Sequence, residues 1–108
     1  MAVDAALAAL SDPTRRELVE ALGRGPTRAG DLAERFPISR PAVSKHLRVL
    51  REAGLVDAEE NGRERVYYLV PRGLDEVKRY MDRAARMWDD ALDAFKRYAE
   101  GGDDDDRS

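Results

Sequence analysis

Apolar residues in the first quarter of the chain recur at helical spacing, and residues that end helices interrupt them. This pattern predicts a first helix over residues 3–10 and a second over residues 13–22. Ser11 or Asp12 is placed to cap the second helix, and Gly23 ends it. The sequence therefore predicts two helices that meet at a tight corner.

Two further helices follow between residues 28 and 53. Thr27 is placed to cap the first of them, which Pro37-Ile38 ends after about two turns. Ser39 is placed to cap the second, and Gly54 stands where the left-handed residue after a helix is expected. Two short helices across a tight turn predict a helix-turn-helix over about residues 28–53.

After this point the apolar pattern changes from helical to extended. Residues 55–60 and 65–70 are expected to be strands, and the second is rich in β-branched and aromatic residues. Asn61-Gly62 between them is a strong hairpin signal. A hairpin over about residues 55–70 that follows a helix-turn-helix is typical of a wing, so the fold class expected is mainly α with a small β-hairpin wing.

Residues 74–99 form a last, long predicted helix with a heptad pattern. Its apolar residues fall into two sets with a spacing of seven, offset by three: Leu74, Met81, Trp88 and Phe95, and Val77, Ala84, Ala91 and Tyr98. Pairing with the same helix of a second copy would bury this seam; packing wholly on the chain's own domain is the alternative. The predicted dimer interface is Leu7, Leu74, Val77, Met81, Ala84, Trp88, Ala91 and Phe95.

The length of 108 residues fits one domain, here residues 1–100, followed by an acidic tail over residues 101–108 that is expected to be disordered. The net charge of −3 is misleading for the domain itself. Four of the 22 acidic residues lie in 103–106 and one of the 19 basic residues is Arg107, so residues 1–100 carry 18 of each. Within them, residues 35–51 hold five basic residues and no acidic one, and such a local field attracts phosphate.

The basic helix over residues 39–53 separates into two faces. Val43, Leu47 and Leu50 share one face, and polar side chains occupy the other. A helix held on one side and open on the other can enter the DNA major groove. The predicted DNA-binding residues are Ser39, Arg40, Pro41, Ser44, Lys45, His46, Arg48, Arg63 and Arg65.

Three of these assignments leave an alternative open. His46 lies on the flank of the helix, where it either reaches the DNA backbone or packs at the helix edge. Arg63 and Arg65 bracket the hairpin tip over residues 61–65, where they either grip DNA or solvate an edge strand. Outside this set, arginines at the helix starts either add phosphate contacts or are surface charges: Arg15, Arg16 and Arg28.

Several classes of function find little support in the sequence. One histidine, no cysteine and no glycine-rich phosphate loop leave little for an enzyme. No apolar run is long enough to span a bilayer, and the start of the chain lacks a basic segment. The sequence therefore predicts neither a membrane anchor nor a signal peptide, and we expect a cytoplasmic protein. The remaining rivals are a winged helix that binds only proteins and an architectural DNA binder without sequence preference.

Two motifs resemble those of the ArsR family of small winged-helix repressors. Residues 10–16 (LSDPTRR) resemble its opening signature, and residues 38–56 (ISRPAVSKHLRVLREAGLV) resemble its recognition-helix block. The resemblance covers about residues 3–98. It implies a five-helix winged fold, a homodimer built from the first and last helices, and repression relieved by an inducer. A two-fold dimer in turn implies a pseudo-palindromic operator in double-stranded DNA. The resemblance also places Arg40, Ser44, Lys45 and His46 at DNA-contacting positions.

The chain departs from the family pattern at the positions where many members sense metals. Residues 28–34 contain no thiol, and the last helix carries aspartates but no histidine. Carboxylates alone are a poor ligand set for zinc or a softer metal. The sequence therefore predicts no metal site and no cofactor, and it leaves any inducer unidentified.

Overall fold

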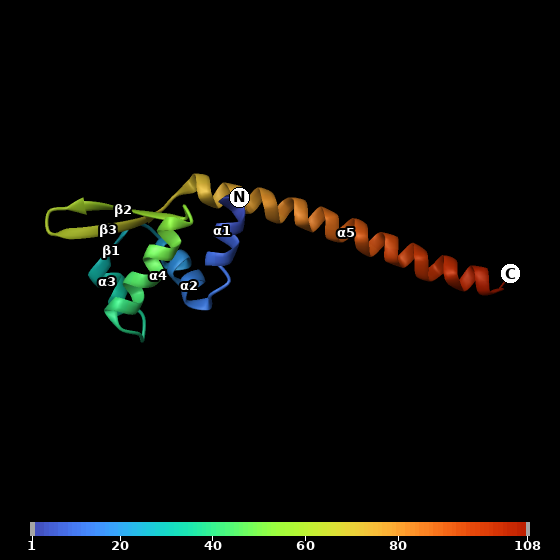
Figure 1. Cartoon of the computed structure of the whole chain (residues 1–108), viewed down its shortest axis with the longest axis horizontal. Helices are drawn as coiled ribbons and strands as arrows, with labels where there is room; N and C mark the ends of the chain where they lie inside the picture. The colour runs from blue at the N-terminus through green and yellow to red at the C-terminus, as the bar shows by residue number, and fades with distance from the viewer. Residues whose placement is uncertain (1, 108) are drawn as a thin grey trace. The chain divides into compact units, whose positions relative to one another are not determined.

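The computed structural model describes the backbone of residues 2–107 and the side chains of residues 3–101. The chain divides into two compact units, Met1–Val77 and Lys78–Ser108. Along the chain the elements are α1 (Ala2–Ala9), α2 (Pro13–Leu22), β1 (Thr27–Arg28), α3 (Ala29–Glu34), α4 (Arg40–Glu52), β2 (Val56–Asn61), β3 (Glu64–Leu69) and α5 (Pro71–Arg107), as labelled in Figure 1. The first unit holds α1 to β3 and the start of α5, and α5 alone supplies the second.

The corner between α1 and α2 is built from side chains that satisfy helix ends. Asp12 is the N-cap of α2, and its carboxylate accepts a hydrogen bond from the Arg15 N–H at 3.0 Å. Ser11, the other candidate cap, instead donates its hydroxyl to the Ala8 carbonyl at 2.6 Å, at the end of α1. Of the two predicted caps, Asp12 is therefore the one used.

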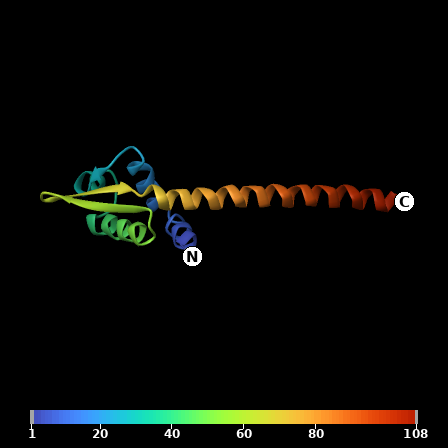
Figure 2. The same cartoon turned by 90° about the horizontal axis from the view of Figure 1, so that it is seen from above.

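The predicted hairpin is present and belongs to a three-stranded antiparallel sheet. The strand order is β1-β3-β2, and the β2–β3 register runs from Val56↔Leu69 to Asn61↔Glu64. The two-residue turn is Gly62-Arg63, one residue later than the predicted Asn61-Gly62, because Asn61 ends β2 and pairs with Glu64; Gly62, at the first turn position, has a φ of +68°. In both views the tip of the hairpin extends beyond α3 and α4 (Figures 1 and 2).

The prediction that Thr27 caps a helix is wrong. Thr27 lies in β1, where it pairs with Tyr67, and its hydroxyl donates to the Gly25 carbonyl at 3.0 Å. The N-cap of α3 is Arg28, which makes no side-chain capping bond. The third strand escaped prediction because two residues are too few to carry an alternating pattern, and its partner strand is far along the sequence.

One apolar core holds the first unit together. Fully buried side chains come from α2, α3, α4 and the segment that enters β2: Leu18, Leu32, Val43, Leu47, Leu50, Leu55 and Val56. In α4 they recur at spacings of three and four, and the predicted inward face of that helix is thus confirmed.

The end of α4 lies against the first turn of α5 through two glycines. Gly54 has a φ of +79°, in the left-handed region predicted for it. A Cβ added to Gly73 would collide with the Gly54 carbonyl oxygen, which is backbone and cannot swing aside. Nearby, the Val70 N–H donates to the Leu55 carbonyl at 2.9 Å. Position 73 therefore requires glycine for close packing rather than for a special φ.

Helix α5 is longer at both ends than the predicted helix over residues 74–99. It begins at Pro71, because proline fits the first turn of a helix, where its missing N–H has no partner to lose. It continues to Arg107, since glycine at 101 and 102 weakens a helix by about 1 kcal/mol each without forbidding it. The side chains of residues 102–108 lie outside the described part, and the disorder of the tail stays a prediction.

Charged residues recur all along α5, and within the described residues no helix has an apolar stretch long enough to cross a bilayer.

Candidate nucleic-acid interface

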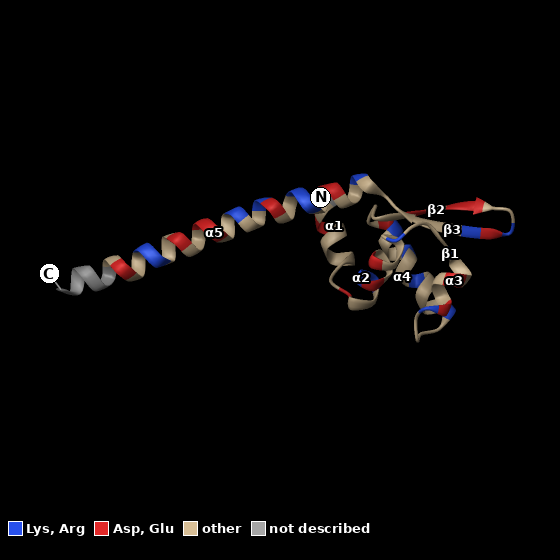
Figure 3. Ribbon diagram, turned by 180° about the vertical axis from the view of Figure 1, so that it is seen from behind, with Lys and Arg blue, Asp and Glu red and all other residues tan. Residues whose placement is uncertain are grey.

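Helix α4 carries the largest predicted set of DNA-binding residues, and its two faces are as expected. Val43 and Leu47 are each only 2% exposed, whereas the polar face is open to solvent. The exposed predicted residues of α4 are Arg40, Pro41, Ser44, Lys45 and Arg48. Lys and Arg residues are visible along the α4 ribbon in Figure 3.

The N-terminus of α4 is ordered by its own side chains. The Ser39 hydroxyl accepts a hydrogen bond from the Ala42 N–H at 3.2 Å, and its own proton can still be donated. A Cβ built at Gly30 would lie 4.0 Å from Arg40 Nη2, so the Arg40 side chain passes over the start of α3. An exposed helix start with Ser39 and Arg40 beside it favours an anion.

Helix α3 shares the apolar core with the inner face of α4. Leu32 at its centre is fully buried in the same core as Val43 and Leu47. A small hollow between the two helices is lined by Ala29, Gly30 and Ala33 from α3 and by Arg40, Val43, Ser44 and Leu47 from α4, with Tyr67 from β3. The small residues on α3 thus leave this hollow open beside α4.

The two predicted arginines of the hairpin differ in their surroundings. Arg63 is exposed at the tip, whereas Arg65 Nε lies 2.9 Å from Glu60 Oε1 on the neighbouring strand. Hydrogen bonds that Arg65 donates, first to Tyr67 and then to Glu60, raise the pKa of Arg65. Arg65 can therefore reach a phosphate only by exchanging one partner for another.

Acidic side chains gather on the other strand of the hairpin. Asp57, Glu59 and Glu60 lie on β2, which is largely red in Figure 3. Asp57 pairs with Arg51 of α4 at 3.0 Å. Burial raises the pKa of Tyr68, and the nearby carboxylates of Asp57 and Glu59 add to the rise. The basic character of the hairpin is therefore confined to β3 and its tip.

Arg28 is held between two carboxylates near the base of the hairpin. Its Nη1 lies 3.1 Å from Glu64 Oε1, and its Nε lies 3.3 Å from Asp31 Oδ2. The hydrogen bond to Glu64, followed by the charges of Glu64 and Asp31, raises the pKa of Arg28. Of the two roles considered for Arg28, the structure places it in a surface ion pair that joins α3 to β3.

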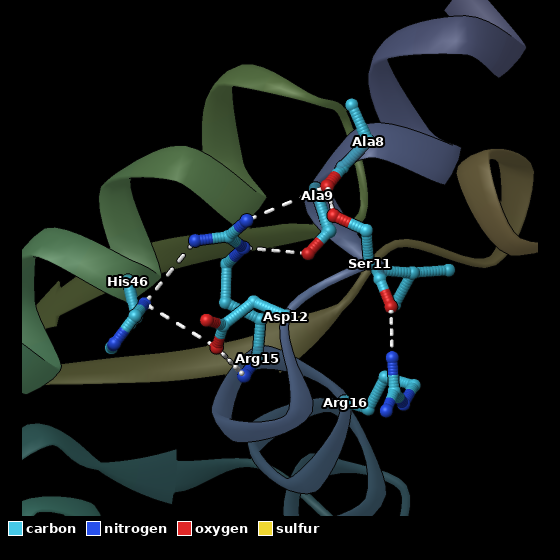
Figure 4. A network of polar contacts seen from close by, with 8 residues as sticks. Ala8, Ala9, Ser11, Asp12, Arg15, Arg16 and His46 are labelled. Atoms are coloured by element: carbon cyan, nitrogen blue, oxygen red, sulfur yellow. Dashed lines mark hydrogen bonds and ion pairs between the residues drawn. The ribbon is translucent and has the colours of Figure 1, made fainter.

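His46 does not point along the exposed face of α4. Its side chain is 22% exposed, and its Nδ1 lies 3.4 Å from Arg15 Nη1 and 4.0 Å from Asp12 Oδ2 (Figure 4). Arg15 also donates from Nε to the Ala9 carbonyl at 2.5 Å, and Arg16 donates to the Leu10 carbonyl at 2.8 Å. Both arginines are thus engaged with the end of α1.

Asp12 and Arg15 were not singled out together with His46 from the sequence. No helical or strand spacing relates residues that lie 31 positions apart. The available signal was that the sole histidine falls on the flank of α4, between its inner and outer faces.

Comparison with known proteins places the chain in a family. Residues 12–58 match the family model described as "Bacterial regulatory protein, arsR family". The HTH-type transcriptional regulator Rv2034 of Mycobacterium tuberculosis is 44% identical over 102 residues, which are 94% of this chain and 92% of that protein. The chain belongs to the ArsR family.

Two other ArsR-like comparisons agree with this assignment. The solved structure of an ArsR-like transcriptional regulator from Rhodococcus sp. RHA1 is 40% identical, covers 91% of this chain and 92% of its own, and has a TM-score of 0.74. The transcriptional repressor SdpR of Bacillus subtilis is 43% identical over 60 residues, which are 56% of this chain and 66% of that protein. The mainly helical fold with a hairpin wing, expected from the sequence, is that of the ArsR family.

The predicted dimer residues of this ArsR-family chain fall into two groups. Leu7 is half-buried, and Leu74 and Val77 pack partly against the core of the first unit. In the second unit Trp88 is 67% exposed and Phe95 is 66% exposed. Met81 and Ala91 are exposed as well, and Ala84 is half-buried. The first group thus has an intrachain role already, whereas the exposed apolar residues of the second have none that the structure describes.

Among the described residues, no three side chains of the His, Asp or Glu type are grouped so that they could hold a metal ion. The expectation that this ArsR-family protein has no metal site stays a prediction.

Proposed function

We propose that this protein is a homodimeric, sequence-specific DNA-binding regulator of transcription that acts in the cytoplasm without catalysis of its own. In this proposal α4 enters the major groove, and the hairpin tip over residues 61–65 lies beside it. Repression is the direction favoured, because SdpR is named a repressor.

The observation that carries the proposal is the separation of faces on α4. The residues of its inner face are at most 2% exposed, so the core holds the helix on one side. Its outer face offers arginine, serine and lysine within two turns, and these side chains bind phosphate oxygens and base edges. We assign direct base contacts to Arg40 and Ser44, phosphate contacts to Ser39, Lys45 and Arg48, and an apolar contact with the sugar to Pro41.

The hairpin adds a second, weaker contact in this proposal. Arg63 at the tip is the side chain best placed to enter a neighbouring minor groove. Arg65 contributes after leaving Glu60, and that exchange of partners makes its net gain small.

The dimer follows from the apolar face of α5. Large apolar side chains of the second unit are exposed in the single chain: Tyr80, Met81, Met87, Trp88, Leu92, Phe95 and Tyr98. A contiguous apolar face of this kind marks an interaction surface, and its heptad spacing suits a second α5. A two-fold axis would then present two α4 helices to successive turns of DNA and would favour a pseudo-palindromic operator.

Selection of bound duplexes from random DNA at a fixed salt concentration tests the proposal. We expect recovery of a motif with two related half-sites whose centres are about 10 base pairs apart or a multiple of that. Specific binding should exceed non-specific binding by roughly 10³-fold or more. The salt concentration has to be stated, because phosphate contacts make every affinity salt-dependent.

Two other outcomes would each replace the proposal with a different function. Salt-dependent binding without any recovered motif would indicate an architectural DNA binder. No salt-dependent binding at all would indicate a winged helix that binds proteins only. A transcription assay with the recovered motif upstream of a reporter then separates repression from activation and provides the assay in which an inducer can be sought.

A further inference from the structure

We propose that Arg15, whose backbone N–H is held by Asp12, is a positioning residue for α4, which it holds at its correct rotation by donating to Nδ1 of His46. The inference rests on the proposed function, since α4 is taken to be the helix that reads DNA. Neither Asp12 nor Arg15 contacts DNA in this proposal, and His46 acts through the protein rather than through a base.

Arg15 is fixed in place by the end of α1. Its Nε donates to the Ala9 carbonyl at 2.5 Å, and its Nη2 lies 3.4 Å from the Ala8 carbonyl. These carbonyls belong to the last turn of α1, which lacks partners within the helix and attracts a cation. The remaining Nη1 faces His46 Nδ1 at 3.4 Å, as the dashed lines in Figure 4 show. Arg15 thus joins the end of α1 to the flank of α4.

Asp12 is fixed by the start of α2. Its Oδ2 accepts the Arg15 N–H at 3.0 Å and lies 4.0 Å from His46 Nδ1. That backbone hydrogen bond lowers the pKa of Asp12, and the nearby charge of Arg15 lowers it further, while burial opposes the fall. The Asp12 carboxylate therefore fixes the backbone of Arg15 in the first turn of α2.

The proton on His46 is assigned by these neighbours. An imidazole nitrogen that faces an arginine N–H must accept, so Nδ1 carries no proton and Nε2 carries it. In Figure 4 the other ring nitrogen points away from the cluster. On α4 itself, the residues one turn before and after His46 are all uncharged: Ala42, Val43, Val49 and Leu50.

This contact adds a polar restraint at the flank of α4 to the apolar restraint of the core. Buried Val43 and Leu47 hold the inner face of the helix, and Arg15 holds His46 beside that face. His46 lies on the flank, where a roll would displace it from Arg15. Lys45 directly precedes His46, so the same roll would move a predicted DNA contact, and displacements of about 1 Å disturb such geometry.

The tautomer can be measured without DNA, and the test therefore stands apart from the proposed function. His46 is the sole histidine, so long-range ¹H–¹⁵N spectra of the full chain contain one imidazole and need no further assignment. We expect the Nε2–H form in the native protein, a mixture of forms in Arg15→Met, and the native form in Arg16→Met. Arg16 is a matched control because it donates to the Leu10 carbonyl and makes no contact with His46 that the structure records. A native spectrum with the proton on Nδ1 would overturn the proposal.

Two substitutions of His46 separate positioning from DNA contact. His46→Asn places an acceptor near the position of Nδ1, and His46→Gln places a donor near that of Nε2. On the duplex recovered by selection, we expect His46→Asn to stay within about threefold of native affinity and His46→Gln to lose about tenfold, or about 1.4 kcal/mol. Retention by His46→Gln with loss by His46→Asn, or equal effects of both, would overturn the proposal. Thermal unfolding of both variants checks that the fold is intact.

Discussion

Arg40 and Lys45 occupy different places on the exposed face of α4 and should fail in different ways. Arg40 begins the helix, where side chains reach base edges, so Arg40→Ala should cost about 1–3 kcal/mol of specific affinity and relax the preferred motif. Lys45→Ala should weaken binding to all sequences and lower the slope of log affinity against log salt by about 1 if Lys45 meets a phosphate. Binding titrations at several salt concentrations measure both.

Arg24→Ala is the control for these two variants. Arg24 is exposed in the turn after α2, and its replacement by alanine removes the same positive charge. It should leave the preferred motif unchanged. If Arg24→Ala reduced specific affinity as much as Arg40→Ala, α4 would not be the helix that reads DNA.

Asp12 should make the folded state sensitive to acid. Its pKa is lowered in the folded state, chiefly by the Arg15 N–H, so it contributes stability above its ordinary pKa that is lost as the pH falls through the folded value. Asp12→Asn should therefore unfold at lower urea concentration than the native chain at about pH 7, and the difference should shrink towards about pH 3. If the stability difference between Asp12→Asn and the native chain were the same at both pH values, the charge of the Asp12 carboxylate would not be its cause.

At the residue scale, the sequence was most informative about which side of a helix each residue faces. The inner and outer faces of α4 follow from helical spacing, because one buried face repeats every three to four residues. The surroundings of Arg28 and His46 did not follow, since their partners Glu64 and Arg15 come from other elements. Pairs of this kind depend on how elements pack, and no local pattern encodes them.

At the scale of elements, the close contact between Gly54 and Gly73 should tolerate no added side-chain atom at position 73. Gly73→Ala would drive a Cβ into the Gly54 carbonyl, so we expect a loss of about 1–3 kcal/mol or more in the free energy of unfolding. Equilibrium unfolding in urea, with folded and unfolded baselines both recorded, measures this change in the free energy of unfolding. This loss should outweigh the gain of about 1 kcal/mol or less in the free energy of unfolding that is expected from alanine's better helix propensity.

Gly30→Ala is the matched control for this substitution. Gly30 is also helical, and a Cβ there meets only the flexible end of Arg40 at 4.0 Å. It should therefore be neutral or stabilising by about 0.4–1 kcal/mol. Equal destabilisation by both variants would mean that α5 does not begin against the end of α4.

The elements themselves were largely predictable because their boundaries carry chemical signals. Pro13, Ser39 and the Asn61-Gly62 pair mark starts and turns through their own backbone preferences. The short strand β1 and the capping role of Thr27 were not, because β1 exists only through its pairing with β3. The backbone of α5 stays helical past its predicted end at residue 99, because glycine at 101 and 102 weakens a helix without ending it.

The assembled molecule should depend on the apolar face of α5 in the second unit. Trp88→Arg puts a charge into the predicted seam, so we expect monomers in sedimentation and a loss of affinity for a two-half-site duplex. Binding to a single half-site should change much less, because each copy keeps its own α4.

Asp90→Arg supplies the comparison for Trp88→Arg. It introduces the same side chain two residues further along the helix, on a different face at about 100° per residue. This variant should remain dimeric. A dimeric Trp88→Arg would contradict the assignment of the seam.

Trp88 is also the sole tryptophan of the chain, and 67% of its side chain is exposed to solvent when the chain is alone. Indole emission shifts to shorter wavelength when water is removed from the ring, so this protein carries a built-in optical reporter of its own association. Dilution of the native protein should shift the emission towards the red at the concentration where copies separate. The predicted DNA-reading helix has no indole, so that signal would follow assembly rather than operator binding.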